Sequence, residues 1–349
     1  MKPTKLSFLD RHLSLWIVLA MLLGIGLSVW FPSVPQSLQA MSLDGVSLPI
    51  AMGLMLMMYP PLAKVDYGQL HTVFQDRRTL ALSLLQNWVV GPVLMFVLAV
   101  VFLHDQPDYM TGLILIGLAR CIAMVLIWNQ LAQGDTQYAA ALVAFNSVFQ
   151  IVFFSAYAWL FLGYLPSVLG LNTHMVAIEF KVVWQSVLLY LGVPFALGWL
   201  TRSVLLRWRG DAWYQQVFLP KISPLALWAL LFTIVMMFAL KGTDVVRLPV
   251  DVLRIAIPLC LYFGLMFASS YWLSKRLGND DAKTTALAFT AAGNNFELAL
   301  AVAIATFGLT SPVAFTTIIG PLVEVPMLLL LVRVALRLQA ASQQKVHPK

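Results

Sequence analysis

The sequence contains the stretch Gly112-Leu-Ile-Leu-Ile-Gly-Leu-Ala-Arg-Cys-Ile-Ala-Met-Val-Leu-Ile-Trp-Asn129, which is apolar enough to span a membrane as a helix. Arg120 and Cys121, however, lie at its middle. A guanidinium at bilayer depth costs about 2.5–3.5 kcal/mol on insertion scales, so Arg120 should face a partner or a water-filled cavity. The thiol beside it is a soft ligand for soft metals and metalloids. The pair therefore predicts a transport site, whose remaining groups come from elsewhere in the chain.

The composition places the whole chain in a membrane. Of its 349 residues, 60% are hydrophobic and only 11% are charged, against about 25% charged residues in soluble domains. We attribute the net charge of +7 to loops beside the membrane rather than to nucleic-acid contacts. Cys121 and Cys260 fall in separate apolar stretches and do not resemble a disulfide framework. The sequence predicts an all-α, polytopic membrane protein that contacts the lipid bilayer, binds no nucleic acid and needs no cofactor.

Ten stretches are long enough to cross a bilayer, or nearly so, by the criterion of about 20 apolar residues. They are residues 13–31, 47–63, 79–103, 110–131, 138–162, 181–201, 222–240, 249–273, 284–306 and 313–338. Tyr59-Pro60-Pro61 should stop or kink the second of them. Most of the 22 lysines and arginines lie on the cytoplasmic side if the chain starts there. We therefore expect ten transmembrane helices in the plasma membrane, with both termini cytoplasmic.

The ten spans divide into two sets of five around the longest re-entry segment, from Gly163 to Glu179. An odd number of spans per half places the halves in opposite orientation, as in the inverted repeats of many transporters. We expect residues 1–162 to form the first five-helix repeat and residues 163–180 to form a periplasmic or extracellular linker. Residues 181–338 should form the second repeat, followed by a cytoplasmic tail at 339–349.

Polar residues recur at corresponding places in the two halves, which points to a binding site near the membrane midplane. The fourth span carries Ala119-Arg120-Cys121, the ninth carries Gly293-Asn294-Asn295-Phe296-Glu297, the fifth carries Asn146 and Gln150, and the tenth carries Gly320, Pro321 and Glu324. Gly293-Asn294-Asn295 should break the ninth helix, because glycine weakens helices and asparagine competes for backbone hydrogen bonds. A matching break near Arg120 would let broken helices 4 and 9 cross.

Two glutamates and one thiol are the candidates for the transport chemistry. Glu297 is the expected counter-charge of Arg120, either to hold the crossing together or to shape the site. Glu324 has no basic residue near its depth in its own span, and desolvation favours a carboxyl that takes up and releases a proton. The alternative is a permanently neutral acid, hydrogen-bonded to a neighbour such as Asn146. Cys121 is either an inert buried thiol or, because of the cation beside it, a ligand.

Other chemistries find little support in the sequence. The chain lacks P-loop, HExxH, GxSxG and CxxC motifs. Its histidines all fall in predicted loops or tails, which argues against a membrane-embedded histidine metal site: His12, His71, His104, His174 and His347. An intramembrane enzyme with Cys121 as nucleophile would lack a base at membrane depth. Cys260 lies in an apolar helix and should be inert. We expect neither enzymatic activity nor a structural metal.

At these residues the sequence resembles the arsenical-resistance family of arsenite efflux permeases, in the bile acid/arsenite/riboflavin transporter superfamily. The resemblance extends from Leu9 to about Arg337 and shows no departure at the polar positions. It is most specific in six blocks: Leu56–Lys64, Asn87–Pro92, Tyr109–Met124, Leu219–Leu225, Asn294–Leu298 and Ile319–Pro326.

The resemblance implies a site, a fold and a mode of transport. The family's transport cysteine and tenth-span glutamate fall on Cys121 and Glu324. Its intramembrane arginine, asparagines and ninth-span glutamate fall on Arg120, Asn294, Asn295 and Glu297. The resemblance also implies the bile-acid-transporter fold, in which helices of both repeats build a panel domain and a core domain, and broken helices 4 and 9 cross in the core. Transport in the family is metalloid export driven by the proton gradient.

We therefore predict a secondary transporter that exports arsenite, and antimonite as a related substrate, from the cytoplasm in exchange for protons, conferring arsenic resistance. The predicted substrate contacts are Cys121, as the As(III) ligand, with Arg120, Asn294, Asn295 and Asn146, and the predicted proton carriers are Glu324 and Glu297. One sulfur suits a transporter, because a cage of three thiolates would bind the metalloid too tightly to release it.

The alternative is a sodium-coupled organic-anion symporter of the same superfamily. Asn294, Asn295 and Glu297 could coordinate sodium, but Arg120 beside them argues against a cation there, and Cys121 would have no role. The sequence does not decide between arsenite and antimonite, and it does not set the proton stoichiometry. It also does not set the oligomeric state, for which a homodimer is one candidate.

Overall fold

The computed structural model describes residues 13–43, 46–67, 75–171 and 179–346, which are almost entirely helical. The α-helices are α2 (Leu13–Trp30), α3 (Ser33–Ala40), α4 (Leu48–Lys64), α6 (Arg77–Leu85), α7 (Gly91–Leu103), α8 (Pro107–Leu118), α9 (Met124–Leu131), α10 (Thr136–Ala158), α11 (Leu165–Val168), α12 (Phe180–Val187), α13 (Val193–Trp213), α14 (Leu219–Arg247), α15 (Pro249–Arg276), α16 (Asp281–Ala292), α17 (Phe296–Phe307) and α18 (Pro312–Val346). Two short strands, β1 (Ser42–Leu43) and β2 (Val46–Ser47), pair antiparallel before α4. His12, His71, His174, His347 and residues 172–178 of the predicted linker lie outside the described residues.

Turns of π-helix join several α-helical segments end to end. They are η2 (Gln86–Val90), η3 (Trp159–Tyr164), η4 (Leu188–Gly192) and η5 (Tyr214–Phe218). Each precedes a helix with proline at its second residue: Pro92, Pro166, Pro194 and Pro220. Proline has no N–H to donate and its ring clashes with the preceding turn, so a widened turn lets the helix continue.

Six helical stretches are long and apolar enough to cross a membrane: Leu13–Trp30, Arg77–Leu103, Thr136–Val168, Phe180–Arg247, Pro249–Arg276 and Pro312–Ser342. The longest of them is interrupted at Gly210, whose φ of 81° lies in the left-handed region open to glycine. Shorter apolar helices are α4, α8 and α17. The chain is thus a helical, multi-pass membrane protein. The count of ten spans and the two inverted repeats stay predictions.

The structure differs from one predicted helix end and excludes one of the two effects expected of Tyr59-Pro60-Pro61, which were to stop or to kink the second span. Tyr59-Pro60-Pro61 does not stop α4, which continues to Lys64. Tyrosine hydroxyls satisfy carbonyls of its last turn, since Tyr214 donates to Ala63 (2.8 Å). The fifth predicted span does not end at residue 162, because the helix continues through η3 and α11 to Val168.

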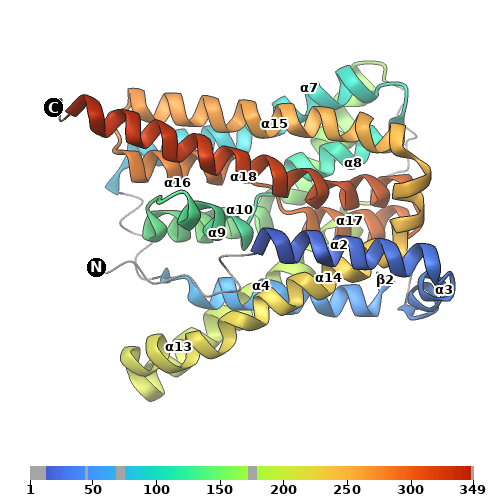
Figure 1. Cartoon of the computed structure of the whole chain (residues 1–349), viewed down its shortest axis with the longest axis horizontal. Coiled ribbons are helices and arrows are strands. Elements are labelled where there is room, and N and C mark those ends of the chain that lie inside the picture. The colour runs from blue at the N-terminus through green and yellow to red at the C-terminus, as the bar shows by residue number, and fades with distance from the viewer. Residues whose placement is uncertain (1–12, 44–45, 68–74, 172–178, 347–349) are drawn as a thin grey trace.

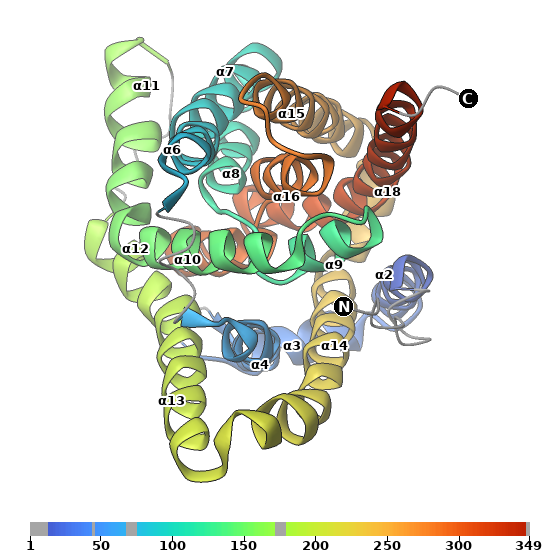
Figure 2. The same ribbon diagram turned by 90° about the vertical axis from the view of Figure 1, so that its left-hand side faces the viewer.

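One group of helices, hereafter the side layer, consists of α2, α4, α13 and α14. α14 packs along both α2 and α4, and α13 packs along α4 (Figures 1 and 2). Gly24 permits the close contact of α2 with α14, since a Cβ at this position would stand 2.6 Å from the Cβ of Phe238. A hydrogen bond of 3.0 Å between Ser28 and Thr243 joins the same two helices.

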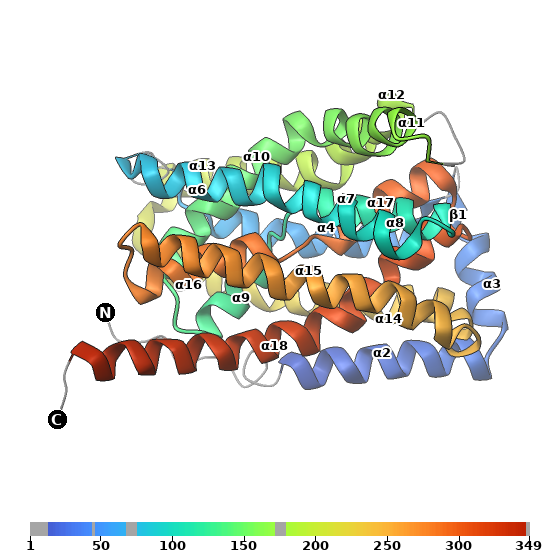
Figure 3. The ribbon, with the colours of Figure 1, turned by 90° about the horizontal axis from the view of Figure 1, so that it is seen from above.

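A second group, hereafter the crossing bundle, contains α7, α8 and α15 to α18. α8 packs against α7 and α18, and α15 packs against α16 and α18 (Figure 3). α9 and α10 cover the side of the crossing bundle that faces the side layer (Figure 2). The buried polar residues singled out by the sequence lie on α10, on α18 or in the segments 119–123 and 293–295 between helices, and not on the side layer.

Candidate functional site

Two apolar helices of the crossing bundle are broken at their middle. Residues 119–123 separate α8 from α9, and residues 293–295 separate α16 from α17. These are the break predicted at Gly293-Asn294-Asn295 and the matching break predicted beside Arg120. Each break gives one helix a free C-terminal end and the next helix a free N-terminal end, so four half-helix ends are available.

The two breaks are bonded to each other through their backbones. The N–H of Cys121 donates to the carbonyl of Gly293 (3.3 Å), and the N–H of Asn295 donates to the carbonyl of Ala119 (3.0 Å). The segments form an isolated antiparallel bridge between these bonds. All four half-helix ends therefore meet at one place, which we call the crossing.

The C-terminal ends at the crossing receive a cation and an amide. Arg120 and Asn294 face each other across the bridge. The Arg120 guanidinium donates to the carbonyl of Gly117, in the last turn of α8, and to that of Ala291, in the last turn of α16 (3.4 Å). The Asn294 amide donates to the carbonyl of Ile116 (2.6 Å). Carbonyls of a last turn lack partners within their helix and form its negative pole, so these donors stabilise both ends.

The predicted ion pair of Arg120 with Glu297 is wrong for this structure. Among the described residues, the guanidinium has carbonyl partners and the ring of Tyr262, whose centroid is 6.0 Å from Cζ. Glu297 instead lies beside a void of about 10 Å³ that Met58 and Tyr190 also line. Backbone carbonyls balance the arginine charge in place of a carboxylate, and the sequence does not mark where such carbonyls become free.

The N-terminal ends at the crossing carry electron-rich atoms instead. Cys121 Sγ accepts a hydrogen bond from the N–H of Val125 (3.2 Å) at the start of α9. Asn295 Oδ1 accepts one from the N–H of Leu298 (2.9 Å) and so caps α17, and Glu297 lies in the first turn of that helix. First-turn N–H groups and the positive pole of the helix favour such atoms. The crossing therefore separates its charges, with the cation at the C-terminal ends and sulfur and oxygen at the N-terminal ends.

Gln150 of α10 holds the unwound Arg120 peptide in place. Its side-chain oxygen accepts from the Arg120 N–H (2.8 Å), and its amide donates to the Arg120 carbonyl (3.1 Å). The sequence marks Gln150 as a polar interruption of the fifth span but does not place it in the predicted site. One feature of the sequence could have assigned Gln150 to the site. It lies four residues after Asn146, so both side chains are on the same face of the helix.

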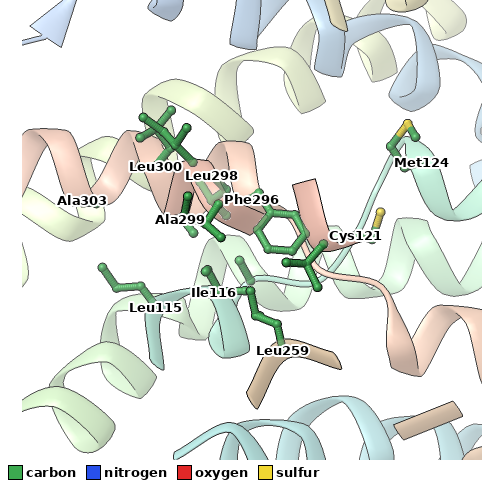
Figure 4. Close-up of a cluster of buried hydrophobic side chains, with 14 of the residues drawn as sticks. Leu115, Ile116, Cys121, Met124, Leu259, Phe296, Leu298, Ala299, Leu300 and Ala303 are labelled. Carbon is green, nitrogen blue, oxygen red and sulfur yellow. The ribbon is translucent and has the colours of Figure 1, made fainter. Parts of the chain in front are cut away.

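Glycines make room for the side chains at the crossing. A Cβ on Gly293 would stand 2.9 Å from the Cβ of Cys121, and one on Gly320 would stand 1.7 Å from the ring of Phe296. Figure 4 shows Cys121 and Met124 on the same side of Phe296, at the edge of a buried hydrophobic cluster. Sequence reasoning treated Gly293 as a helix breaker only, because the distance to Cys121 depends on how the two helices cross.

Asn146 is positioned by an aromatic cluster. Its carbonyl oxygen accepts from the indole N–H of Trp88 (3.1 Å), and its amide nitrogen is buried with no partner among the described residues. The Trp88 ring packs on Phe149 at 4.1 Å between centroids, and the Trp88 carbonyl accepts from the hydroxyl of Tyr157 (2.9 Å). Trp88 therefore fixes the orientation of Asn146 and leaves both N–H donors of its amide without a partner among the described residues.

Glu324 of α18 is buried between two prolines of the same helix, with 4% of its surface exposed. Its carboxyl lies within electrostatic range of the Cys121 thiol and of Glu297. Its Oε1 atom has no hydrogen-bond partner among the described residues, and no bond to Asn146 is formed within them. Of the predicted site residues, Glu324 and Glu297 are thus brought within electrostatic range of each other, and neither forms an ion pair among the described residues.

A cleft of about 650 Å³ leads from one end of the molecule toward the crossing. It lies between α4 and α14 of the side layer and α9 and α10 on the opposite wall (Figure 2). Lys64 and Gln137 are exposed at its mouth, and Met124, the first residue of α9, is buried at its other end. The cleft wall also carries Gln130 and Ser223. The walls therefore carry hydrogen-bonding side chains among apolar ones.

Residues 51–248 match the sodium bile acid symporter family. The chain is 50% identical to the arsenical-resistance protein Acr3 of Corynebacterium glutamicum over 331 residues, which cover 95% of this chain and 90% of that protein. The chain belongs to the Acr3 family of arsenical-resistance proteins, within the sodium bile acid symporter family. The Acr3 protein of Alkaliphilus metalliredigens is 30% identical over 95% of this chain and 93% of that protein. An uncharacterized transporter of Synechocystis is 36% identical over 94% of the chain and 88% of that protein.

Membership of this family makes the chain an integral membrane transporter and not an enzyme. The matched relatives align along nearly the whole chain, so the crossing and both walls of the cleft fall within the shared region. Cys121, Arg120 and Gln150 also fall within the part matched by the symporter family. The buried thiol, the two carboxyls and the cleft therefore lie in the part of the chain that is shared with these transporters.

Proposed function

We propose that the chain exports arsenite from the cytoplasm in exchange for protons and so confers arsenical resistance. The observation that carries the proposal is the position of Cys121, in the break just before α9 and three residues before Met124 at the buried end of the cleft. The Acr3 proteins similar to this chain are named for arsenical resistance, which supports arsenite as the substrate.

The binding step uses one sulfur and two amide groups. Arsenite near neutral pH is an uncharged trihydroxide, and the Cys121 thiol displaces one hydroxyl, so that an S–As bond forms and the thiol proton leaves with the hydroxyl as water. Asn146 Nδ2 and Asn294 Oδ1 have no partners among the described residues, and they serve as donor and acceptor for the remaining hydroxyls. Arg120 and Asn295 shape the site through the helix ends that they cap. A single sulfur keeps binding reversible.

Glu324 carries the exchanged proton, with Glu297 as a second acceptor. Both carboxyls are close enough to interact, and no cation separates them among the described residues. Two desolvated carboxyls favour sharing a proton over holding two negative charges. Glu324 takes up a proton while the crossing faces outward and releases it while the crossing faces the cytoplasm.

The transport cycle needs an architecture in which the two groups of helices move against each other. We propose ten spans in two inverted repeats, residues 1–162 and 181–338, with a linker at 163–180, a cytoplasmic tail at 339–349 and assembly as a homodimer. The side layer acts as the panel and the crossing bundle as the core. α2 and α18 run in opposite directions (Figures 1 and 3). This arrangement is required if the N-terminus, before α2, and the C-terminus, after α18, both lie in the cytoplasm. The cleft mouth, where Lys64 lies, faces the cytoplasm.

Inside-out membrane vesicles test the proposal, because export from the cytoplasm becomes uptake into the vesicle. Arsenite uptake is measured with and without an acidic vesicle interior for the wild type, Cys121→Ala and Glu324→Gln, with Cys260→Ala as the matched thiol control. We expect wild-type and Cys260→Ala vesicles to accumulate arsenite on acidification and Cys121→Ala vesicles to remain at background. Glu324→Gln vesicles that still accumulate arsenite on acidification would show that Glu324 is not the proton carrier.

Two further conditions in the same assay define the substrate and the coupling ion. Replacing sodium by choline should leave arsenite uptake unchanged, whereas a requirement for sodium would favour the symporter alternative. Unlabelled antimonite should compete with arsenite for uptake, because both are neutral trihydroxides of similar hydroxyl pattern. Lack of competition would restrict the site to arsenite.

A further inference from the structure

The positive charge of Arg120 is fully buried and has no acidic partner among the described residues. Its guanidinium donates instead to the carbonyls of Gly117 and Ala291. Gly117 belongs to the last turn of α8, and Ala291 belongs to the last turn of α16. One side chain therefore joins the C-terminal ends of two half-helices that come from distant parts of the sequence.

The two helix ends together carry a negative charge about equal in size to the positive charge of the arginine. A helix C-terminus is equivalent to about −0.5 elementary charge, so two converging ends present about one negative charge. In transporters with broken helices, C-terminal half-helix ends and unwound carbonyls are the groups that coordinate cations such as sodium. The guanidinium of Arg120 is thus located where the backbone of the crossing would hold a bound cation.

The surroundings of the guanidinium are shaped to contain it. Gly91 provides the space, since a Cβ there would stand 2.9 Å from Arg120 Nη1 and 3.1 Å from the hydroxyl of Tyr262. That hydroxyl and Arg120 Nε are buried without hydrogen-bond partners among the described residues. Removing the guanidinium would leave a pocket bordered by the carbonyls of Gly117 and Ala291 and by a free hydroxyl. Oxygen ligands of this kind suit a small, hard cation.

We infer that Arg120 is the resident cation of the crossing, which neutralises the C-terminal ends of α8 and α16 and occupies the position that sodium would otherwise fill. The guanidinium is part of the covalent chain, so the two ends keep this partner throughout the transport cycle without uptake of an ion. Arg120 is then the residue that excludes sodium from the crossing. This inference goes beyond arsenite export and does not depend on it, because it concerns only which cation the backbone holds.

Replacing the arginine by serine tests the inference directly. Arg120→Ser removes the charge and leaves a hydroxyl beside the free carbonyls. The purified wild type and variant are heated in sodium chloride or in choline chloride of equal ionic strength, and unfolding is followed by tryptophan fluorescence. We expect Arg120→Ser to unfold at least about 3 °C higher in sodium than in choline, with a shift that grows with sodium concentration, and the wild type to unfold at one temperature in both salts. A folded Arg120→Ser protein that is indifferent to sodium, or a wild type that sodium stabilises, would overturn the inference.

A second pair of variants decides the question if Arg120→Ser does not fold. Arg120→Lys keeps the charge without the planar fork, whereas Arg120→Gln keeps amide donors without the charge. We expect Arg120→Lys to unfold closer to the wild-type temperature than Arg120→Gln does, and to show no response to sodium. If Arg120→Gln unfolds at the same temperature as Arg120→Lys or at a higher one, the inference is overturned. The helix ends would then require hydrogen-bond donors rather than a positive charge.

Discussion

The four half-helix ends at the crossing fall into two pairs with opposite chemistry. The C-terminal ends of α8 and α16 receive donors from Arg120 and Asn294, whereas the N-terminal ends of α9 and α17 carry Cys121 and Asn295. Arg120 and Cys121 are adjacent in sequence, and so are Asn294 and Asn295. Successive side chains of an extended segment point to opposite sides, so each short break supplies one residue to a negative end and the next to a positive end.

This comparison assigns different consequences to neighbouring residues. Changes at the C-terminal ends should lower stability the most, since Arg120 and Asn294 satisfy carbonyls of the fold, although the Oδ1 atom of Asn294 is also proposed to contact arsenite. Changes at the N-terminal ends should act mainly on transport, since Cys121 lies close to the buried end of the cleft. The predictions that follow test this division, and they are arranged by expected size.

The adjacent asparagines provide the largest expected difference. Asn294→Asp removes the donor to the Ile116 carbonyl and places a carboxylate against a negative helix end, so we expect a loss of about 3–5 kcal/mol in the free energy of unfolding. Asn295→Asp keeps an acceptor for the N–H of Leu298 and lies at a positive helix end, where aspartate caps as well as asparagine, so we expect a loss of about 1 kcal/mol. Thermal unfolding at pH 7 measures both, and equal losses would contradict the division of the ends.

Gln150→Ala tests the clamp on the unwound peptide. It leaves the buried N–H and carbonyl of Arg120 without partners, each at a cost of about 1–3 kcal/mol in the free energy of unfolding. The matched control is Gln137→Ala on the same helix, whose exposed side chain should contribute within about 0.5 kcal/mol. Unfolding of both proteins in the same detergent compares them. If Gln150→Ala is no less stable than Gln137→Ala, the clamp does not hold the break.

Gly293→Ala tests whether the second break positions the thiol. The added methyl would stand 2.9 Å from the Cβ of Cys121, so we expect a loss of about 1–3 kcal/mol in the free energy of unfolding and at least about a 10-fold drop in arsenite uptake. Gly264→Ala on α15 is the control, because nothing lies within 4 Å of its added Cβ. Normal uptake by Gly293→Ala vesicles would mean that the position of Cys121 is not critical.

The smallest effect is expected at an ion pair remote from the crossing. Burial alone would raise the pKa of Asp76, but hydrogen bonds from Lys283 and Thr79 lower it below its usual range. A carboxyl with a lowered pKa in the folded state adds stability above its unfolded pKa of about 3.9, and this contribution is lost as the pH falls through the folded value. The Asp76 side chain is 36% exposed, so screening limits the contribution to about 1 kcal/mol or less.

Asp76→Asn measures that contribution. The variant should unfold slightly below the wild-type temperature at pH 7, and the difference should disappear in acid below the usual range of aspartate. High salt should reduce the difference at pH 7, whereas the losses at Asn294 and Gln150 should persist because those contacts are buried. A difference that grows as the pH falls would contradict the lowered pKa.

Several features of the fold follow from local sequence properties. The apolar composition places the chain in a membrane, and Gly293-Asn294-Asn295 breaks its helix where glycine and asparagine weaken it. The end of the fifth span is less predictable, because Pro166 lies where a chain would ordinarily leave its helix. The π-helical turn η3 accommodates this proline and lets the helix continue. Whether such a turn forms depends on the tertiary packing around it, which the local sequence does not reveal.

The sequence by itself determined that Arg120 is costly in a membrane and needs partners there, because that follows from the free energy of transferring a guanidinium into lipid. Only the tertiary structure decided what satisfies Arg120. Its partners are backbone carbonyls of Gly117 and Ala291, which every residue possesses and which become free only where helices end in space. The sequence pointed to Glu297 as the counter-charge of Arg120, whereas the negative poles of two half-helices act in its place.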